Sequence, residues 1–336
     1  MRKLLISVAA VAVLGTWGCT RAPATPEQVE AAYKVAQEAW DAAPTPETKI
    51  TIAKEFLAKH PDTKYTVRVV REAMNVLSEE LGKPGEAETL VRAVRAKVKD
   101  PVTRRRLGVA HVGALATLKN GAQLAQVAAT LGADPGLDFY DQVSIAEAAI
   151  AVEAWDTALT FATEAAGIDG EKLKAISPAG RYPTPADLER AVNKRKAWAL
   201  ADKGWAEFKL GRTEDALETF EVASTLDSRQ IMGNSETSLP VYRGRTLLAA
   251  GKAAEAVEVL VASALYGDEK DARAALEQAW RAQGGQGSFD DYLWSERQRR
   301  AIPAPDFTLP DYEGTPHRFA SLRAAEVTLL TFWFPT

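Results

Sequence analysis

Residues able to perform nucleophilic, redox or metal chemistry are few in this chain. It contains one cysteine, Cys19, and three histidines, His60, His111 and His317. Thiol–disulfide exchange needs an attacking thiolate and a second sulfur, so one cysteine cannot form a redox pair within one molecule. Zinc sites need clustered Cys and His ligands, and serine hydrolases need a nucleophile elbow such as Gly-x-Ser-x-Gly; neither pattern is present. The sequence therefore predicts no catalytic residue, no metal site and no cofactor.

Two glycine-bearing stretches could suggest nucleotide binding, but both fail in detail. Between Gly244 and Gly251, six residues rather than four separate the glycines of a phosphate loop, and Ala253 stands where Ser or Thr is required. The glycine-rich residues 284–287 follow a predicted helix, whereas a dinucleotide fingerprint follows a strand. A net charge of −4 and a pI of about 5.7 give no basic face for nucleic acid.

The elements that would position any site are predicted to be helices. Between residues 27 and 283 the chain is rich in alanine, and its apolar residues recur at three- and four-residue spacing. Breakers such as Pro44-Thr45-Pro46 and Lys83-Pro84-Gly85 arrive at regular intervals. This pattern predicts a mainly α fold of helices of about 12–16 residues joined by short turns.

Two stretches of this helical region share one pattern of small residues and glycines. The pattern resembles the tetratricopeptide repeat, whose period is about 34 residues. Its first glycine would let two helices approach closely, and its second would supply the left-handed turn between them. The residues that carry the resemblance are Gly204, Gly211, Ala216, Phe220 and Ala223 in the first copy and Gly244, Gly251 and Ala256 in the second. The whole range 27–283 is thus predicted to be a TPR-like solenoid.

Stacked repeats of this kind present a concave face to a protein or peptide. The helical region is therefore predicted to be a binding or spacing module with a protein or peptide partner and no nucleic acid. Aromatic side chains are candidates to line its groove, although an aromatic at helical spacing can equally belong to the core. The candidates are Tyr33, Trp40, Trp155, Trp198 and Trp205.

The N-terminal segment has the pattern of an export signal. Two basic residues precede an apolar run, 4–14, and small residues lead to Gly18-Cys19. About eleven apolar residues are too few to cross a bilayer, which needs roughly 20. The Gly18-Cys19 pair resembles the cleavage box of bacterial lipoproteins, which implies a signal peptide over 1–19, a lipid anchor at Cys19, and an envelope location facing the periplasm. Ordinary signal cleavage nearby is the alternative. Residues 20–26 are interpreted as a tether.

A change of composition marks the end of the helical region. Ser288 can cap a helix over 289–299, so residues 284–301 are predicted to form a linker helix. The prolines at 303 and 305 then favour an extended chain entering the last segment, 302–336.

That last segment resembles the beginning of the bacterial thioredoxin-like redoxins. These include the alkyl hydroperoxide reductase/thiol-specific antioxidant group and the membrane-tethered thiol–disulfide oxidoreductases. The resemblance implies an incomplete thioredoxin-like β segment, with the active-site cysteine expected just beyond Thr336. It rests on Pro305, Asp306 and Phe307 at the start, Gly314 in a turn, and Phe332 and Trp333 at the end of an apolar strand over 327–334.

Two functional hypotheses follow from these patterns. The first is an envelope TPR protein of the redoxin family, in which the intact family implies thiol–disulfide exchange or peroxide reduction. The chain as given lacks the cysteines and is expected to be inactive. The alternative is a non-enzymatic scaffold or adaptor lipoprotein that binds a protein partner.

Overall fold

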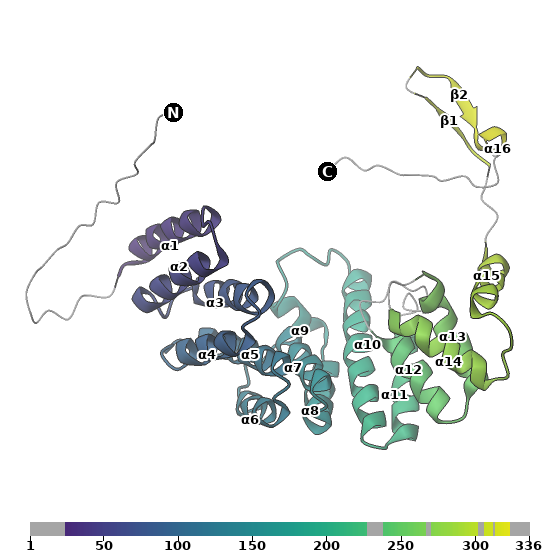
Figure 1. Cartoon of the computed structure of the whole chain (residues 1–336), viewed down its shortest axis with the longest axis horizontal. Coiled ribbons are helices and arrows are strands. Elements are labelled where there is room, and N and C mark those ends of the chain that lie inside the picture. The colour runs from purple at the N-terminus through teal and green to yellow at the C-terminus, as the bar shows by residue number, and fades with distance from the viewer. Residues whose placement is uncertain (1–23, 227–237, 267–269, 302–305, 312, 323–336) are drawn as a thin grey trace, which may run out of the picture. The chain divides into compact units, whose positions relative to one another are not determined.

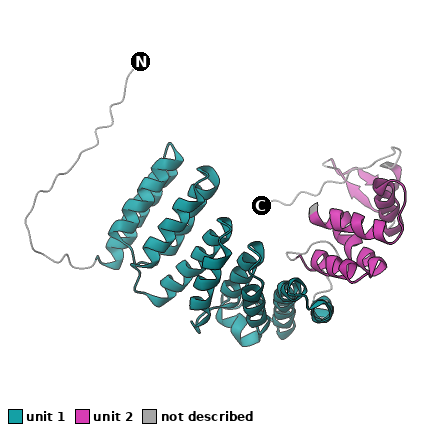
Figure 2. Ribbon diagram, turned by 60° about the horizontal axis from the view of Figure 1, so that its bottom comes forward, with its two compact units in different colours: residues 1–227 teal, residues 228–336 magenta. Residues whose placement is uncertain are grey.

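The computed structural model describes residues 24–226, 238–266, 270–301, 306–311 and 313–322 (Figure 1). These residues form a succession of helices followed by a two-stranded sheet, so the predicted mainly α fold class with a short β segment is confirmed. The chain divides into two compact units, Met1–Asp227 (unit 1) and Ser228–Thr336 (unit 2), which are coloured separately in Figure 2. This boundary falls inside the range that the sequence predicts as one repeat array.

Several predictions fall on parts of the chain outside the described residues. They concern Cys19, Pro305, Phe332, Trp333 and the apolar strand over 327–334.

Unit 1 is built from helices that follow one another through short connections (Figure 2). In chain order they are α1 (Pro26–Asp41), α2 (Pro46–Lys59), α3 (Thr66–Asn75), the π-helical turn η1 (Val76–Glu80), α4 (Pro84–Arg95), α5 (Pro101–Thr117), α6 (Gly121–Gly132), α7 (Phe139–Ala151), α8 (Trp155–Ala166), α9 (Gly170–Ala175), α10 (Pro185–Lys209) and α11 (Thr213–Leu226). Apolar side chains are buried in one cluster over α1–α5, in another centred on α5–α8, and in another over α7–α10.

Local sequence signals set where these helices begin. Thr25 and Gln28 form a capping box at the start of α1: the N–H of Gln28 donates to the Thr25 hydroxyl at 3.3 Å, and the N–H of Thr25 donates to the Gln28 side chain at 3.0 Å. Thr45 caps α2 and Asp100 caps α5 in the same sense, each followed by proline in the first turn. Pro46, Pro84 and Pro101 are thus the first residues of helices.

Helices α10 and α11 pack closely because a glycine lies at their contact. A Cβ on Gly204 would come within 2.7 Å of the Phe220 ring, so only glycine admits this ring without a shift. Phe220, Ala216 and Ala223 are fully buried between the helices. Gly211, at φ +82°, makes the left-handed turn that joins them.

Unit 2 repeats this arrangement. Its elements are α12 (Leu239–Ala249), α13 (Ala253–Tyr266), α14 (Lys270–Ala282), α15 (Phe289–Arg300), β1 (Thr308–Pro310), β2 (Pro316–Arg318) and α16 (Phe319–Leu322). A Cβ on Gly244 would lie 2.4 Å from Leu260 Cγ, Gly251 makes the turn at φ +77°, and Ala256 is buried. Helix α14 packs on both α12 and α13, and Ser288 caps α15 by accepting the N–H of Asp291 at 3.3 Å.

Within residues 306–311 and 313–322, the β segment forms an antiparallel hairpin. Thr308 pairs with Arg318 and Pro310 with Pro316, and Asp311 accepts the N–H of Thr315 at 2.8 Å in the turn. Gly314 lies in this turn at φ +85°. The backbone N–H of Phe319 donates to the carbonyl of Phe307 at 2.8 Å, and their rings stack at 4.7 Å. The hairpin lies between the Asp306-Phe307 start and α16.

Candidate functional site

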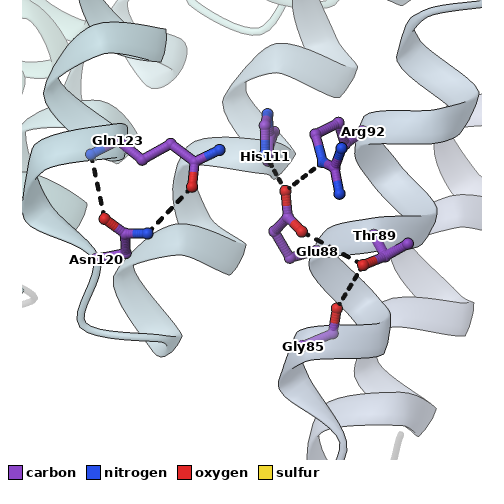
Figure 3. Close-up of polar contacts among 7 residues, drawn as sticks. All are labelled: Gly85, Glu88, Thr89, Arg92, His111, Asn120 and Gln123. Atoms are coloured by element: carbon purple, nitrogen blue, oxygen red, sulfur yellow. Dashed lines mark hydrogen bonds and ion pairs between the residues drawn. The ribbon is translucent and has the colours of Figure 1, made fainter.

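His111 belongs to a buried polar cluster in unit 1. Its Nε2 lies 2.9 Å from Glu88 Oε1, and Arg92 Nε donates to the same oxygen at 2.8 Å (Figure 3). Burial acts to raise the pKa of Glu88, but the hydrogen bonds from His111 and Arg92 outweigh it and hold that pKa below its usual value. Burial lowers the pKa of His111 in spite of Glu88, and its Nδ1 has no hydrogen-bond partner. A neutral histidine donating to an ionised Glu88 therefore joins α4 to α5.

The other contacts in this view lie at the start of α6 and within α4. Asn120 caps α6 by accepting the N–H of Gln123 at 3.2 Å, and Thr89 donates to the carbonyl of Gly85 at 2.9 Å (Figure 3). The hydrogen bonds drawn there cap α6, join side chains within α4, or join α4 to α5. This cluster is therefore assigned to the scaffold.

A second buried group lies between α7 and α10. Asp202 is 5% exposed, and its Oδ2 has no hydrogen-bond partner. Burial raises the pKa of Asp202 well above its usual value, and the neighbouring Glu147 adds to the rise. Burial also raises the pKa of Glu147, against a 3.0 Å hydrogen bond from Trp198 Nε1. The stability of unit 1 should therefore depend on pH through the ionisation of these two buried carboxyl groups.

A pocket lined by aromatic and charged side chains opens where α1, α2 and α3 meet. We refer to it as the α1–α3 pocket. Its cavity volume is about 80 Å³. Helix α1 contributes residues at i, i+4, i+7 and i+8, which lie on one helix face. Its polar and aromatic lining consists of Tyr33, Gln37, Trp40 and Asp41 of α1, Phe56 of α2, and Arg68 and Glu72 of α3.

Tyr33 forms the aromatic wall of the α1–α3 pocket. Its ring stacks on Tyr65 with centroids 3.8 Å apart and meets Phe56 edge-on at 5.9 Å. The side chain is 7% exposed, yet its hydroxyl has no hydrogen-bond partner. Burial raises the pKa of this hydroxyl, with smaller influences from Arg68, which lowers it, and from Glu72, which raises it. The unused hydroxyl therefore lies among charges that also line the pocket.

The charged side chains around this pocket are paired, with one exception. Arg68 Nε lies 2.8 Å from Glu72 Oε1, and Lys49 Nζ lies 3.6 Å from Glu80. Asp41 has no ion pair within the described ranges. It is the last residue of α1, whose final turn contains no basic residue. The charged residues that line the pocket, Asp41, Arg68 and Glu72, thus leave it one net negative charge.

An apolar groove adjoins this pocket on α1 and α2; we refer to it as the α1–α2 groove. Its volume is about 410 Å³. Alanines, valine and isoleucine dominate its walls, and Val35 is 65% exposed there. The groove and the pocket share Ala36, Ile52 and Phe56, so they meet along the same helix pair.

The structure gathers only some of the residues singled out from the sequence. Tyr33 and Trp40 line the α1–α3 pocket together. Trp205 is buried, and Trp155 and Trp198 are half-buried elsewhere in unit 1. Asp41, Arg68 and Glu72 were not singled out. The acidic end of α1, without a basic residue in its last turn, was the available signal.

The described residues contain no group of three or more His, Cys, Asp or Glu side chains placed to hold a metal ion. None of the described helices is long and apolar enough to cross a membrane.

Comparison with known proteins gives little beyond the helices themselves. No protein-family model matches the chain, and no curated protein matches it. Among solved structures, a tetratricopeptide repeat protein from Parabacteroides merdae ATCC 43184 is similar, with 13% sequence identity and a TM-score of 0.33. The match covers 75% of this chain and 98% of that one. The fold described above rests on the packing of this chain's own helix pairs.

Proposed function

We propose that this protein is a non-enzymatic binding module that holds a segment of another protein at the α1–α3 pocket. The observation that carries the proposal is a pocket lined by Tyr33, whose buried hydroxyl has no hydrogen-bond partner, and by Asp41, which has no ion pair within the described residues. A buried polar group left without a hydrogen bond costs roughly 1–3 kcal/mol, and a ligand that supplies the bond recovers it. Tyr33 and Asp41 are therefore positioned to gain from a bound partner.

The adjoining α1–α2 groove favours a peptide segment over a small molecule. A segment that enters the pocket with one side chain can lay apolar neighbours along the groove, since both share Ala36, Ile52 and Phe56. Anchoring one side chain in a pocket and burying apolar contacts beside it is a common mode of peptide recognition.

A peptide-display selection against the full-length chain tests this function. Ala36 lines both the pocket and the groove, so Ala36→Trp would fill both. Ala58→Trp places the same side chain at an exposed position of α2 outside both. We expect selected peptides to bind the wild type and Ala58→Trp alike and to bind Ala36→Trp at least about tenfold more weakly. Equal binding to a folded Ala36→Trp, as judged by circular dichroism, would refute the proposal.

For the C-terminal segment we propose membership of the redoxin group. The support is the hairpin that follows Asp306 and Phe307, with Gly314 in its turn. The test is the reading frame that follows the codon of Thr336. A Cys-x-x-Cys, or a single cysteine within a few codons, is the expected result, and its absence would remove the redox assignment. A thiol-reductase assay of this chain alone should read zero under either outcome.

For the N-terminus we propose export and lipidation at Cys19, with the mature protein anchored in the cell envelope. The support is the Gly18-Cys19 pair after a short apolar run. Mass spectrometry of the membrane fraction should find a diacylated or triacylated N-terminal cysteine. Cys19→Ala should remove the modification; a wild-type protein without acyl chains would exclude the anchor.

A further inference from the structure

We infer that the α1–α3 pocket receives the basic side chain of a lysine or arginine from the bound segment. This inference rests on the proposed function and names the chemistry of the partner at the site.

The charge balance of the pocket selects a cation. The guanidinium of Arg68 is neutralised by Glu72 at 2.8 Å, and the nearby Lys49 is neutralised by Glu80 at 3.6 Å. Asp41 is the charge left over. An acidic ligand would have to displace Glu72 from Arg68 and would meet Asp41 without compensation. A cationic ligand requires neither change.

The dipole of helix α1 adds to the negative electrostatic potential at the pocket. Asp41 is its last residue, so the carboxylate lies where the helix macrodipole is already negative. No basic residue occupies the final turn of α1 to offset either contribution. The macrodipole stabilises a positive charge at this position. A lysine or arginine of the partner would supply the missing positive charge.

The hydrogen-bonding groups of the pocket match an ammonium or guanidinium. Tyr33 offers an unused hydroxyl oxygen, Gln37 a side-chain carbonyl, and Asp41 a carboxylate. An ammonium carries three donors and no acceptor, and a guanidinium five donors and no acceptor. A cavity of about 80 Å³ holds the end of one such side chain and nothing larger.

The aromatic rings of this site already attract cations from the protein itself. Arg68 lies 5.8 Å from the centroid of Tyr33, and Lys49 lies 5.9 Å from the centroid of Trp40. Such distances lie within the range of cation–π attraction. The methylene stem of an incoming lysine can pack on Trp40 and Phe56 while its ammonium reaches Asp41.

The test measures binding of capped peptides to the full-length chain. The probes are acetyl-Ala-Ala-Lys-Ala-Ala-amide and the same peptide with norleucine or glutamate in place of lysine. Norleucine keeps the stem and removes the charge. Indole N–H resonances from a 15N-labelled protein report occupancy next to Trp40, which is assigned with Trp40→Phe. The variants are Asp41→Asn and, as a matched loss of one carboxylate, Glu218→Gln. Glu218 is exposed on α11 and lines neither the pocket nor the groove.

We expect the lysine peptide to shift the Trp40 resonance and to bind roughly tenfold more tightly than the norleucine peptide, with an affinity that falls as salt is added. Asp41→Asn should remove that preference, whereas Glu218→Gln should keep it. If norleucine binds as well as lysine, the site takes apolar side chains: the proposed function stands and this inference falls. Preferred binding of glutamate also overturns the inference. If none of the peptides moves the Trp40 resonance at millimolar concentration, both the inference and the proposed function fail.

Discussion

The phenol of Tyr33 has a hydroxyl that its own fold does not use. Its ring packs against Tyr65 and Phe56, and phenylalanine would keep both contacts. We expect Tyr33→Phe to raise the free energy of unfolding by about 1 kcal/mol, because it removes an unsatisfied buried group. Tyr65→Phe is the matched control, since the Tyr65 hydroxyl donates to Glu30 and its loss should lower stability. Urea unfolding of both variants measures the difference. A loss of stability in Tyr33→Phe would show that the hydroxyl has a partner after all.

His111 predicts a pH dependence of stability with a definite sign. Burial lowers its pKa in the folded state below the unfolded value near 6.5, so the folded chain binds fewer protons there. The stability it contributes is present above pH 6.5 and is lost as the pH falls through that value. We expect His111→Gln, which keeps a donor for Glu88, to lose less stability than the wild type between pH 8 and pH 5.5 in urea titrations. Parallel curves for the two proteins would contradict this.

At Asp202 we expect stability to depend on pH in the opposite direction. Burial and Glu147 raise its pKa well above the usual value, so the folded state binds more protons, and stability is lost as the pH rises above the unfolded pKa of about 3.8. The neutral amide of Asp202→Asn avoids the cost of ionising a buried carboxyl. We expect this variant to exceed the wild type in stability by a margin that grows from pH 4 to pH 8. Glu218→Gln, an exposed change on α11, is the control. If the difference in stability between Asp202→Asn and the wild type does not change with pH, the pKa of Asp202 is not raised in the folded state.

At the scale of helices, glycine marks where two of them touch. Gly204→Ala would place a Cβ 2.7 Å from the Phe220 ring, and overpacking of this kind costs about 1–3 kcal/mol. Gly113, on the exposed face of α5, has no atom within 4 Å of its virtual Cβ. Gly113→Ala should therefore stabilise by about 0.5–1 kcal/mol through helix propensity. Thermal unfolding of the two variants should show shifts of opposite sign; equal shifts would mean that the contact at Gly204 can relax.

Elements specified by neighbouring residues were predictable from the sequence. Ser288 caps the helix it was expected to cap, and Gly211 adopts the left-handed turn expected of it. Local chemistry decides these features, so the sequence displays them. The start of α10 was not foreseen: the first residue of the repeat pattern is Gly204, whereas the helix begins at Pro185, capped by Thr184. The repeat pattern records packing contacts, and a helix can extend beyond them.

The candidate site was predictable only in part. Tyr33 and Trp40 stood out as aromatics, but nothing in a linear pattern distinguishes a groove residue from a core residue. Arg68 joins them only because α3 folds back beside α1. The missing partner of the Tyr33 hydroxyl depends on every side chain packed around it. Such properties arise from tertiary packing, and spacing along one helix does not encode them.

At the scale of the whole molecule, the two units each have their own buried side chains. In unit 2, Leu247, Leu260 and Leu276 are buried within α12–α14, whose helices contact one another. In unit 1, the apolar clusters run from α1 to α10. A compact unit with its own core can open as one cooperative block while the rest of the chain stays folded.

Glycine variants placed in each unit test whether the units unfold separately. Gly244→Ala would bring a Cβ to 2.4 Å from Leu260 Cγ. A cost of about 1–3 kcal/mol corresponds to amide exchange that is faster by about 5-fold to about 150-fold wherever opening is shared. We expect hydrogen exchange followed by mass spectrometry to show faster exchange in α12–α14 and unchanged exchange in α1–α11. Gly204→Ala should give the reverse result, with unit 1 affected and unit 2 unchanged. If either variant accelerates exchange in both units, opening is shared along the chain, and partner binding at the α1–α3 pocket would then stabilise unit 2 as well.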